Sequence, residues 1–168
     1  QHSHELSSVF DMANSHSRMK NMTPIIKKIE LLKGNTHTYS FSPKESLTCR
    51  MEIVPKNRIN DARLAISIED TYGRRITTLT NYTSNYKKID ITSKQVITCT
   101  VPSLMLAPGK YYLSFSVSRK HEGLIDSINN AVVLEILADD TLEPAEHYTS
   151  IYGPVITECS WICDDQSK

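Results

Sequence analysis

Apolar and polar residues alternate with a period of two along most of the chain between residues 25 and 137, and this period is typical of β-strands. The clearest example is the stretch 46–54, SLTCRMEIV, in which every second residue is apolar. Segments of the same character are residues 25–33, 62–70, 74–80, 95–102, 110–119 and 130–137. Periodicity typical of helices is weak throughout this block. The pattern therefore predicts seven or eight short strands.

Turn-forming residues separate the predicted strands. Pro55 and Asn57 follow one strand, and Thr71-Tyr72-Gly73 joins two others as a hairpin. Residues 81–90 and 119–129 are predicted loops. Short strands with turns at such intervals indicate an all-β fold, an immunoglobulin-like antiparallel β-sandwich.

The composition changes at both ends of this block. We interpret residues 1–24, which are polar, as a linker from a missing upstream domain, and residues 25–137 as the sandwich. Residues 138–168 are interpreted as a tether and a C-terminal strand, because about 17 residues separate the sandwich from the apolar run VITECSWIC at 155–163. Such a strand can be exchanged between protomers, so a domain-swapped homodimer is a hypothesis for this chain. Trp161, within that run, is expected to pack.

Charge and length narrow the classes of partner. The 168 residues carry 19 Lys and Arg against 19 Asp and Glu, so the formal net charge is zero. This balance argues against nucleic acid and against electrostatic docking on an anionic membrane. No apolar run approaches the roughly 20 residues that a spanning helix needs, and no signal peptide is visible. Because the first residue is Gln1, we interpret the chain as a fragment of a longer protein.

The four cysteines indicate reduced thiols in a cytoplasmic protein. Cys49 and Cys99 occupy apolar positions of predicted strands, where a buried thiol behaves as a small hydrophobe. Cys159 and Cys163 lack a second ligand pair at zinc spacing, so no metal site is expected. The histidines near the N-terminus also lack regular ligand spacing.

Motifs of enzymes are not visible in the sequence. The five glycines are scattered singly, and neither a nucleophile elbow nor a zinc-protease motif occurs. Paired carboxylates such as Asp139-Asp140 lie in segments that look exposed. We therefore expect a non-catalytic binding domain with no cofactor in this fragment.

One predicted strand has an unusual outward face. In residues 110–119 the inward positions are large and apolar, whereas Tyr112, Ser114 and Ser116 point outward. If residues 62–70 form a neighbouring strand, Ala65 and Ser67 adjoin these serines. Small side chains in mid-sheet leave a shallow trough, and hydroxyls, an arginine and a tyrosine around it are groups that bind a sugar. The alternative is that serine and threonine are simply ordinary on a solvent-facing sheet.

The order of features resembles one family. The segments SPKESLTCRMEI, ARLAISIEDTYGRRI, VITCTVPSLMLAPGKYYLSFSV and NNAVVLEIL follow one another as in the C-terminal domain of the ATP-binding subunit of O-antigen polysaccharide ABC exporters, the Wzt type. The similarity spans roughly residues 25–137 and is most specific over residues 101–117.

The resemblance implies a function and a set of partners. In that family the domain is a cytoplasmic β-sandwich that recognises the capped non-reducing end of the finished glycan, which licenses export. It follows a nucleotide-binding domain that works with a transmembrane exporter subunit at the inner face of the inner membrane. The family domain is also described as a homodimer with an exchanged C-terminal strand. A module for protein–protein interaction or dimerisation without glycan binding is the alternative.

The predicted glycan-binding residues come from strand alternation and not from the family, because each exporter reads its own cap. The first choices are Arg63, Ser67, Tyr112, Ser114 and Ser116. The second choices, on the hairpin and loop beside that face, are Arg74, Arg75 and Tyr82. An acidic or phosphorylated cap would require an arginine, whose planar fork pairs bidentately with such groups.

Overall fold

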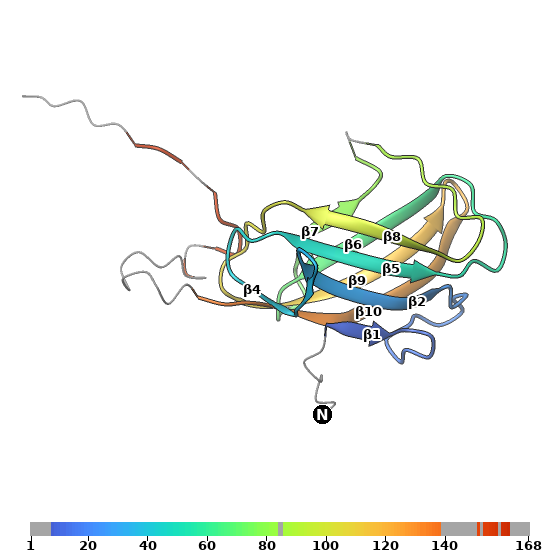
Figure 1. Ribbon diagram of the computed structural model, residues 1–168, viewed down its shortest axis with the longest axis horizontal. Coiled ribbons are helices and arrows are strands. Elements are labelled where there is room, and N and C mark those ends of the chain that lie inside the picture. Colours follow the sequence, from blue (N-terminus) through green and yellow to red (C-terminus); the bar gives the residue numbers. More distant parts are fainter. Residues whose placement is uncertain (1–7, 84–85, 139–150, 152, 158, 162–168) are drawn as a thin grey trace, which may run out of the picture.

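Ten β-strands form two five-stranded sheets in the part of the chain that the computed structural model describes, residues 8–83, 86–138, 151, 153–157 and 159–161 (Figure 1). The strands are β1 (Val9–Asp11), β2 (Ile26–Lys33), β3 (Thr36–His37), β4 (Ser40–Phe41), β5 (Leu47–Ile53), β6 (Ala62–Glu69), β7 (Arg75–Thr80), β8 (Gln95–Val101), β9 (Gly109–Arg119) and β10 (Gly123–Ile136). No α-helix occurs among the described residues. The predicted all-β sandwich is confirmed.

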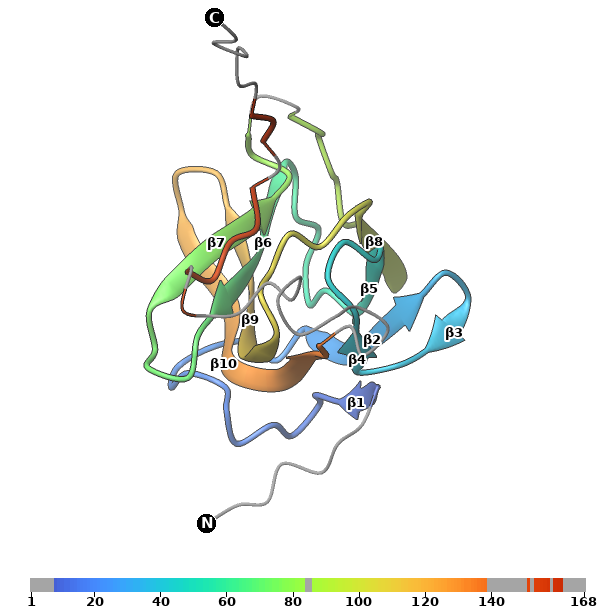
Figure 2. The same cartoon turned by 90° about the vertical axis from the view of Figure 1, so that its left-hand side faces the viewer.

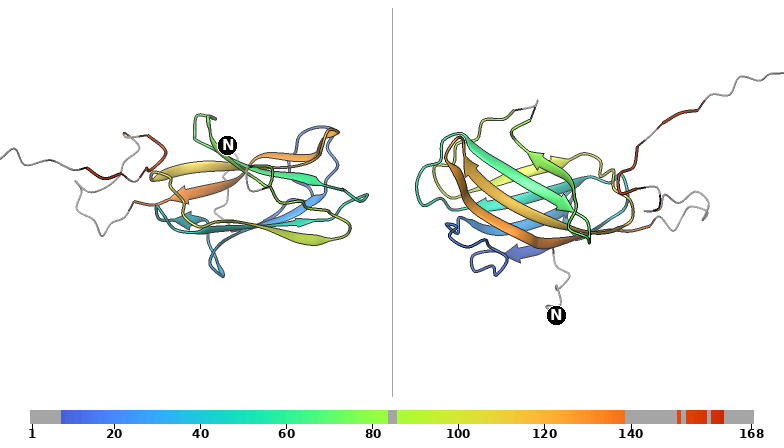
Figure 3. Two further views of the ribbon diagram at one scale, coloured as in Figure 1. Left: turned by 90° about the horizontal axis from the view of Figure 1, so that it is seen from above. Right: turned by 180° about the vertical axis from the view of Figure 1, so that it is seen from behind.

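The two sheets lie face to face. Sheet A has the order β1-β2-β5-β8, with β3 beside β2, and sheet B has the order β4-β10-β9-β6-β7. Figure 2 shows the two layers along the strands, and Figure 3 shows them from above and from behind. All strand pairs are antiparallel except β4 and β10, which are parallel.

The core lies between the sheets and follows the predicted alternation. In β9 the side chains of Leu113, Phe115 and Val117 are at most 1% exposed, whereas Ser114 and Ser116 on the other face are partly exposed. Each fully buried side chain of this size contributes about 1.5–3 kcal/mol relative to an exposed one. β9 is the central strand of sheet B, and its two serines face away from the core.

Strand β10 is longer than predicted. The segment 119–129, predicted as a loop, contains a tight connection and the first half of β10, which pairs with β9 from Gly123 onward. Two register shifts interrupt this pairing, one of them between Ile128 and Val132. Asp126 is fully buried, although it is charged. A charged residue on the buried side of β10 interrupts the alternation of apolar and polar residues that predicts the other strands.

Residues 8–24, within the predicted linker, pack against the sandwich. β1 pairs with β2, Met12 is 2% exposed, and Arg18 bridges to Ile128 of β10. Arg18 also pairs with Asp126, with 2.8 Å between Nε and Oδ1. The packed part of the chain therefore begins before residue 25, whereas a connection of this segment to an upstream domain stays a prediction.

The C-terminal run is described only in part. Val155 forms an isolated bridge with Leu106, and the Ile156 amide donates to the Met105 carbonyl at 2.8 Å. The described residues of 155–163 form no strand, and Trp161 is 93% exposed, so its predicted packing is wrong. Residues 139–150, 152, 158 and 162–168 lie outside the described residues, and the strand exchange stays a prediction.

Candidate functional site

The outward face of sheet B carries small side chains along its centre. Ser67 of β6 lies opposite Ser114 of β9, and Ala65 lies opposite Ser116. Ser116 in turn lies opposite Ser127 of β10. Side chains on directly opposite residues are neighbours on the face of a sheet, so these positions form one patch. The right-hand view of Figure 3 shows this sheet from its outer side.

The patch is hollowed into a concavity of about 330 Å³, which we call the trough. Its lining is Met19, Ala65, Ser67, Arg75, Thr78, Ser114, Phe115, Ser116, Leu124, Ser127 and Asn129. Serine hydroxyls, a threonine and an asparagine supply most of its polar groups. Among the described residues that line it, Arg75 alone is charged. The predicted trough is therefore present as a shape, on the strands expected to form it.

Several hydroxyls of the trough keep hydrogen-bonding capacity. The Asn130 amide donates to Ser114 Oγ at 2.9 Å, which leaves the hydroxyl hydrogen of Ser114 to donate elsewhere. Ser127 Oγ donates to Asn129 Oδ1 at 3.4 Å. Arg75 Nη2 lies 3.4 Å from Glu69 Oε1, a long contact at an exposed position. These groups can donate to and accept from a hydroxylated ligand.

Arg63 and Tyr82 lie together beyond the trough, at the start of β6. The guanidinium carbon of Arg63 is 3.9 Å from the centroid of the Tyr82 ring, a cation–π contact. Arg63 Nε is buried without a hydrogen-bond partner among the described residues. Tyr86 packs edge-to-face on Tyr82 with 5.0 Å between ring centroids. Two of the predicted site residues thus belong to an aromatic cluster that adjoins the trough on the same face.

Asp61 holds this cluster together. Its carboxylate accepts from the hydroxyl of Tyr82 at 3.2 Å and from the hydroxyl of Tyr86. The hydrogen bond from Tyr86 is the largest cause that lowers the pKa of Asp61, and the charge of Lys120, 3.8 Å away, lowers it further. The same hydrogen bond raises the pKa of Tyr86 to about 12. At neutral pH Asp61 is therefore charged and the phenol of Tyr86 is protonated.

The remaining predicted residues lie outside the lining of the trough. Arg74 is at the tip of the β6–β7 hairpin, where its Nε donates to Asp70 Oδ2 at 2.8 Å and its guanidinium lies 5.5 Å from the Tyr72 ring centroid. Tyr112 lies between Glu69 and Val133 on the neighbouring strands. The structure thus brings Ser67, Ser114, Ser116 and Arg75 together and leaves these two residues to one side.

Several residues of the site do not follow from the sequence pattern. Met19 falls in the predicted linker, and Leu124, Ser127 and Asn129 fall in a predicted loop. Thr78 lies on the predicted return strand of the hairpin, where alternation could have placed it beside Ser67. The residues from segments 8–24 and 123–129 gave no such signal, because their position depends on contacts between distant parts of the chain.

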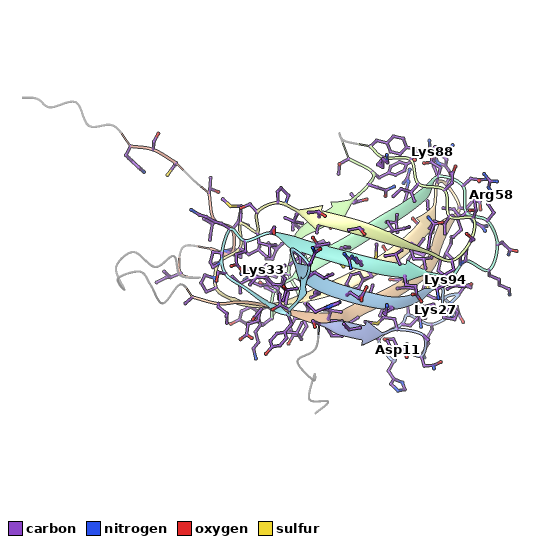
Figure 4. The ribbon with its side chains drawn as sticks, viewed as in Figure 1. Asp11, Lys27, Lys33, Arg58, Lys88 and Lys94 are labelled. Carbon is purple, nitrogen blue, oxygen red and sulfur yellow. The ribbon has the colours of Figure 1, made fainter. Side chains whose placement is uncertain are left out.

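The outward face of sheet A differs in kind. Glu30 lies opposite Arg50, and Lys28 lies opposite Glu52, so charges of opposite sign alternate across its strands. Figure 4 labels several of the charged residues around this sheet, among them Asp11, Lys33 and Lys94. Glu30 Oε1 lies 3.7 Å from Lys28 Nζ, and Glu52 Oε1 lies 3.7 Å from Lys94 Nζ, so these carboxylates have partners at sheet A, whereas the hydroxyls of sheet B surround an open hollow.

Metal-binding, thiol and membrane features are limited in the described part of the chain. No group of three or more His, Cys, Asp or Glu side chains there could hold a metal ion. Cys49 and Cys99, directly opposite on β5 and β8, are free thiols, as is Cys159. Among the described residues, no helix has the length and apolar character needed to cross a membrane.

Comparison with known proteins identifies the family. The Wzt C-terminal domain family matches residues 15–151. A crystal structure of the C-terminal domain of Wzt is similar with a TM-score of 0.67 and 12% identity, over 94% of this chain and 89% of that one. A β-glucuronidase of glycoside hydrolase family 2 gives a TM-score of 0.43 and 18% identity, over 66% of this chain and 11% of that one. No curated protein matches the chain. The chain belongs to the Wzt C-terminal domain family, a family of binding domains with a carbohydrate-binding role in O-antigen export by ABC transporters.

Proposed function

We propose that the trough binds the capped non-reducing end of an O-antigen polysaccharide, and that this binding couples chain completion to export. The observation that carries the proposal is the hollow of small hydroxyl-bearing residues at the centre of sheet B. A sugar ring needs paired donors and acceptors for its hydroxyls as they leave water, and serine, threonine and asparagine side chains supply both. The domain performs no chemistry on the glycan.

Arg75 sets the charge that the trough favours. Its guanidinium is exposed, and its contact with Glu69 is long at 3.4 Å, so an anionic group on the cap could displace the carboxylate. A bidentate pair with a phosphate or carboxylate would fix the orientation of the end of the chain. Affinity in the range of roughly micromolar to millimolar is expected, because a shallow site buries little area.

Filling the trough tests the proposal. Ser116→Trp puts a large ring into the floor of the trough, so binding of the O-polysaccharide from the source organism should be lost in a saturation-transfer NMR titration. Thr100→Trp is the matched control, because Thr100 is exposed on the outward face of sheet A. If the wild-type domain does not bind the polysaccharide, or if Ser116→Trp binds as well as Thr100→Trp, the proposal fails. A domain that dimerises without binding glycan would give the first result.

The setting of the domain is part of the proposal. The parent protein would be the ATPase subunit of an ABC transporter, with an upstream nucleotide-binding domain, and the domain would act in the cytoplasm at the inner face of the inner membrane beside the transmembrane exporter subunit. Residues 8–24 would carry the connection. Because they line the site through Met19, a ligand in the trough would contact the segment that leads to the nucleotide-binding domain.

We also propose a homodimer with an exchanged C-terminal segment. β7 and β8 are the edge strands of the two sheets, and a concavity of about 350 Å³ lined mainly by apolar residues lies between them. Val155 contributes to that lining. Deletion of residues 154–168 should convert the dimer to a monomer in analytical ultracentrifugation. A monomeric wild-type domain across a concentration series would contradict this part of the proposal.

A further inference from the structure

A second concavity, of about 350 Å³, lies at the end of the sandwich where β9 turns into β10. Three segments that are distant in sequence surround it: residues 21–25, the β5–β6 connection, and the β9–β10 connection. This end of the molecule is at the right in Figure 1. We call this concavity the end recess. No sequence pattern predicts a role for it.

The end recess and the trough share a wall. Leu124 lines both concavities and is 49% exposed. The segment beside it is also shared, because Met19 lines the trough, whereas Asn21 and Thr23 line the end recess. An extended ligand that occupies the trough and passes over Leu124 would therefore reach the end recess.

Backbone hydrogen bonds fix this shared wall. The Met19 amide donates to the Ser127 carbonyl at 2.9 Å, and the Thr23 amide donates to the Ile125 carbonyl at 2.9 Å. Segment 19–23 is thereby held beside the first half of β10. A surface that is already ordered costs less to bind a ligand than one that must be ordered on binding.

The side chains of the end recess match a hydroxylated ligand. Lys56 and Arg119 supply donors and Glu122 supplies acceptors, while Asn21 and Asn57 carry amides that do both. Arg119 Nη1 and Glu122 Oε2 are 3.2 Å apart, so the arginine charge is balanced locally. Sugar hydroxyls can accept from Lys56 and Arg119 and donate to the carboxylate of Glu122.

We propose that the end recess binds a sugar of the O-antigen chain next to the terminal residue held in the trough. This inference rests on the proposed function of the trough. The domain then recognises an epitope of two or more sugars that includes the internal structure of the chain, and not the cap alone. Discrimination between polysaccharides that carry the same cap follows from this arrangement.

The experiment compares fragments of the O-polysaccharide of the source organism that retain its non-reducing end. One fragment is the terminal sugar with its cap, and the other contains at least three sugars. Dissociation constants are measured by saturation-transfer NMR for the wild type, for the double variant Lys56→Ala with Glu122→Ala, and for the control double variant Lys94→Ala with Glu52→Ala. The control removes one lysine and one glutamate that lie 3.7 Å apart at sheet A.

The wild type should bind the longer fragment on the order of tenfold more tightly than the terminal sugar, since hydrogen bonds to charged groups are among the stronger ones. Lys56→Ala with Glu122→Ala should abolish that gain and leave the terminal sugar unaffected, and the control should change neither affinity. Both altered side chains are exposed, so thermal midpoints close to that of the wild type are expected.

Three outcomes would overturn the inference while the proposed function stands: equal affinity of the wild type for both fragments, a length effect that survives in the Lys56→Ala, Glu122→Ala variant, or an equal loss for both fragments in that variant. Failure of the wild type to bind either fragment would instead refute the proposed function of the trough.

Discussion

Removing Asp126 should destabilise the fold more than any surface ion pair could, because Asp126 supplies the carboxylate that pairs with a buried guanidinium charge. Its Oδ1 accepts from Arg18 Nε at 2.8 Å, and its Oδ2 accepts from Arg18 Nη2 at 3.2 Å and from the amides of Ile25 and Ile26 at 3.0 and 2.9 Å. The Asp126 side chain is 0% exposed and that of Arg18 is 10% exposed. The other donors of Arg18 reach the carbonyls of Met12, Ala13 and Ile26.

The magnitude follows from what Asp126→Ala leaves behind. The variant strands a guanidinium with little access to water and removes the acceptor of two buried amides. Breaking a buried pair by removing one partner costs about 3–5 kcal/mol. For a chain of this length each kcal/mol lowers the melting temperature by about 2–4 °C, so a loss of about 4 kcal/mol corresponds to about 8–16 °C.

The assay is urea unfolding followed by far-ultraviolet circular dichroism, because Trp161 is 93% exposed and its fluorescence is a poor reporter of the core. The midpoint should fall while the slope of the free energy of unfolding against urea stays the same. Glu122→Gln is the matched control, since it breaks an exposed pair with Arg119 that is worth less than about 1 kcal/mol.

A double-mutant cycle separates the pair from the other contacts of each residue. Arg18→Ala combined with Asp126→Ala should be less destabilising than the sum of the single variants, with a coupling of at least about 2 kcal/mol. If Asp126→Ala costs no more than Glu122→Gln, or if the two single variants simply add, the pair does not hold segment 8–24 against β10 as argued.

Three further predictions concern single residues. The raised pKa of Tyr86 means that the folded state holds the phenol proton more tightly than the unfolded state, so the stability that Tyr86 contributes below pH 10 is lost as the pH rises toward about 12. In a tyrosinate absorbance titration, Tyr86→Phe should remove a step near pH 12, and loss of a step near pH 10 would contradict the role of Asp61. Burial raises the pKa of the Cys49 thiol, so alkylation of the native protein mapped by mass spectrometry should label Cys159 first and Cys49 only after unfolding; early labelling of Cys49 would contradict its burial. Gly73 has a φ of +76°, a backbone conformation that alanine adopts only with strain, although the Cβ of an alanine there would meet open space. Gly73→Ala should therefore lower the free energy of unfolding by about 1 kcal/mol in thermal unfolding. An unchanged midpoint would show that the turn relaxes.

The order of residues is sufficient to predict the two faces of the central strands. Because side chains alternate strictly along a strand, the residues between 62 and 69 and between 109 and 119 can be sorted into core and outward positions from the order of residues alone. That sorting places Ser67, Ser114 and Ser116 on one face, and the register of β6 and β9 makes them neighbours. A local rule is sufficient there because each residue's direction depends only on its own strand.

The boundaries of the trough depend on contacts between segments that are far apart in the sequence. Asp126 looks like a loop residue because a buried carboxylate is unfavourable unless it is paired, and its partner, Arg18, is 108 positions away in the sequence. Once that pair forms, Met19 lines the trough, Asn21 lines the end recess, and Leu124 lines both. No local pattern encodes such a meeting, because the free energy that fixes it is gained only when segments from both ends of the chain are already packed together.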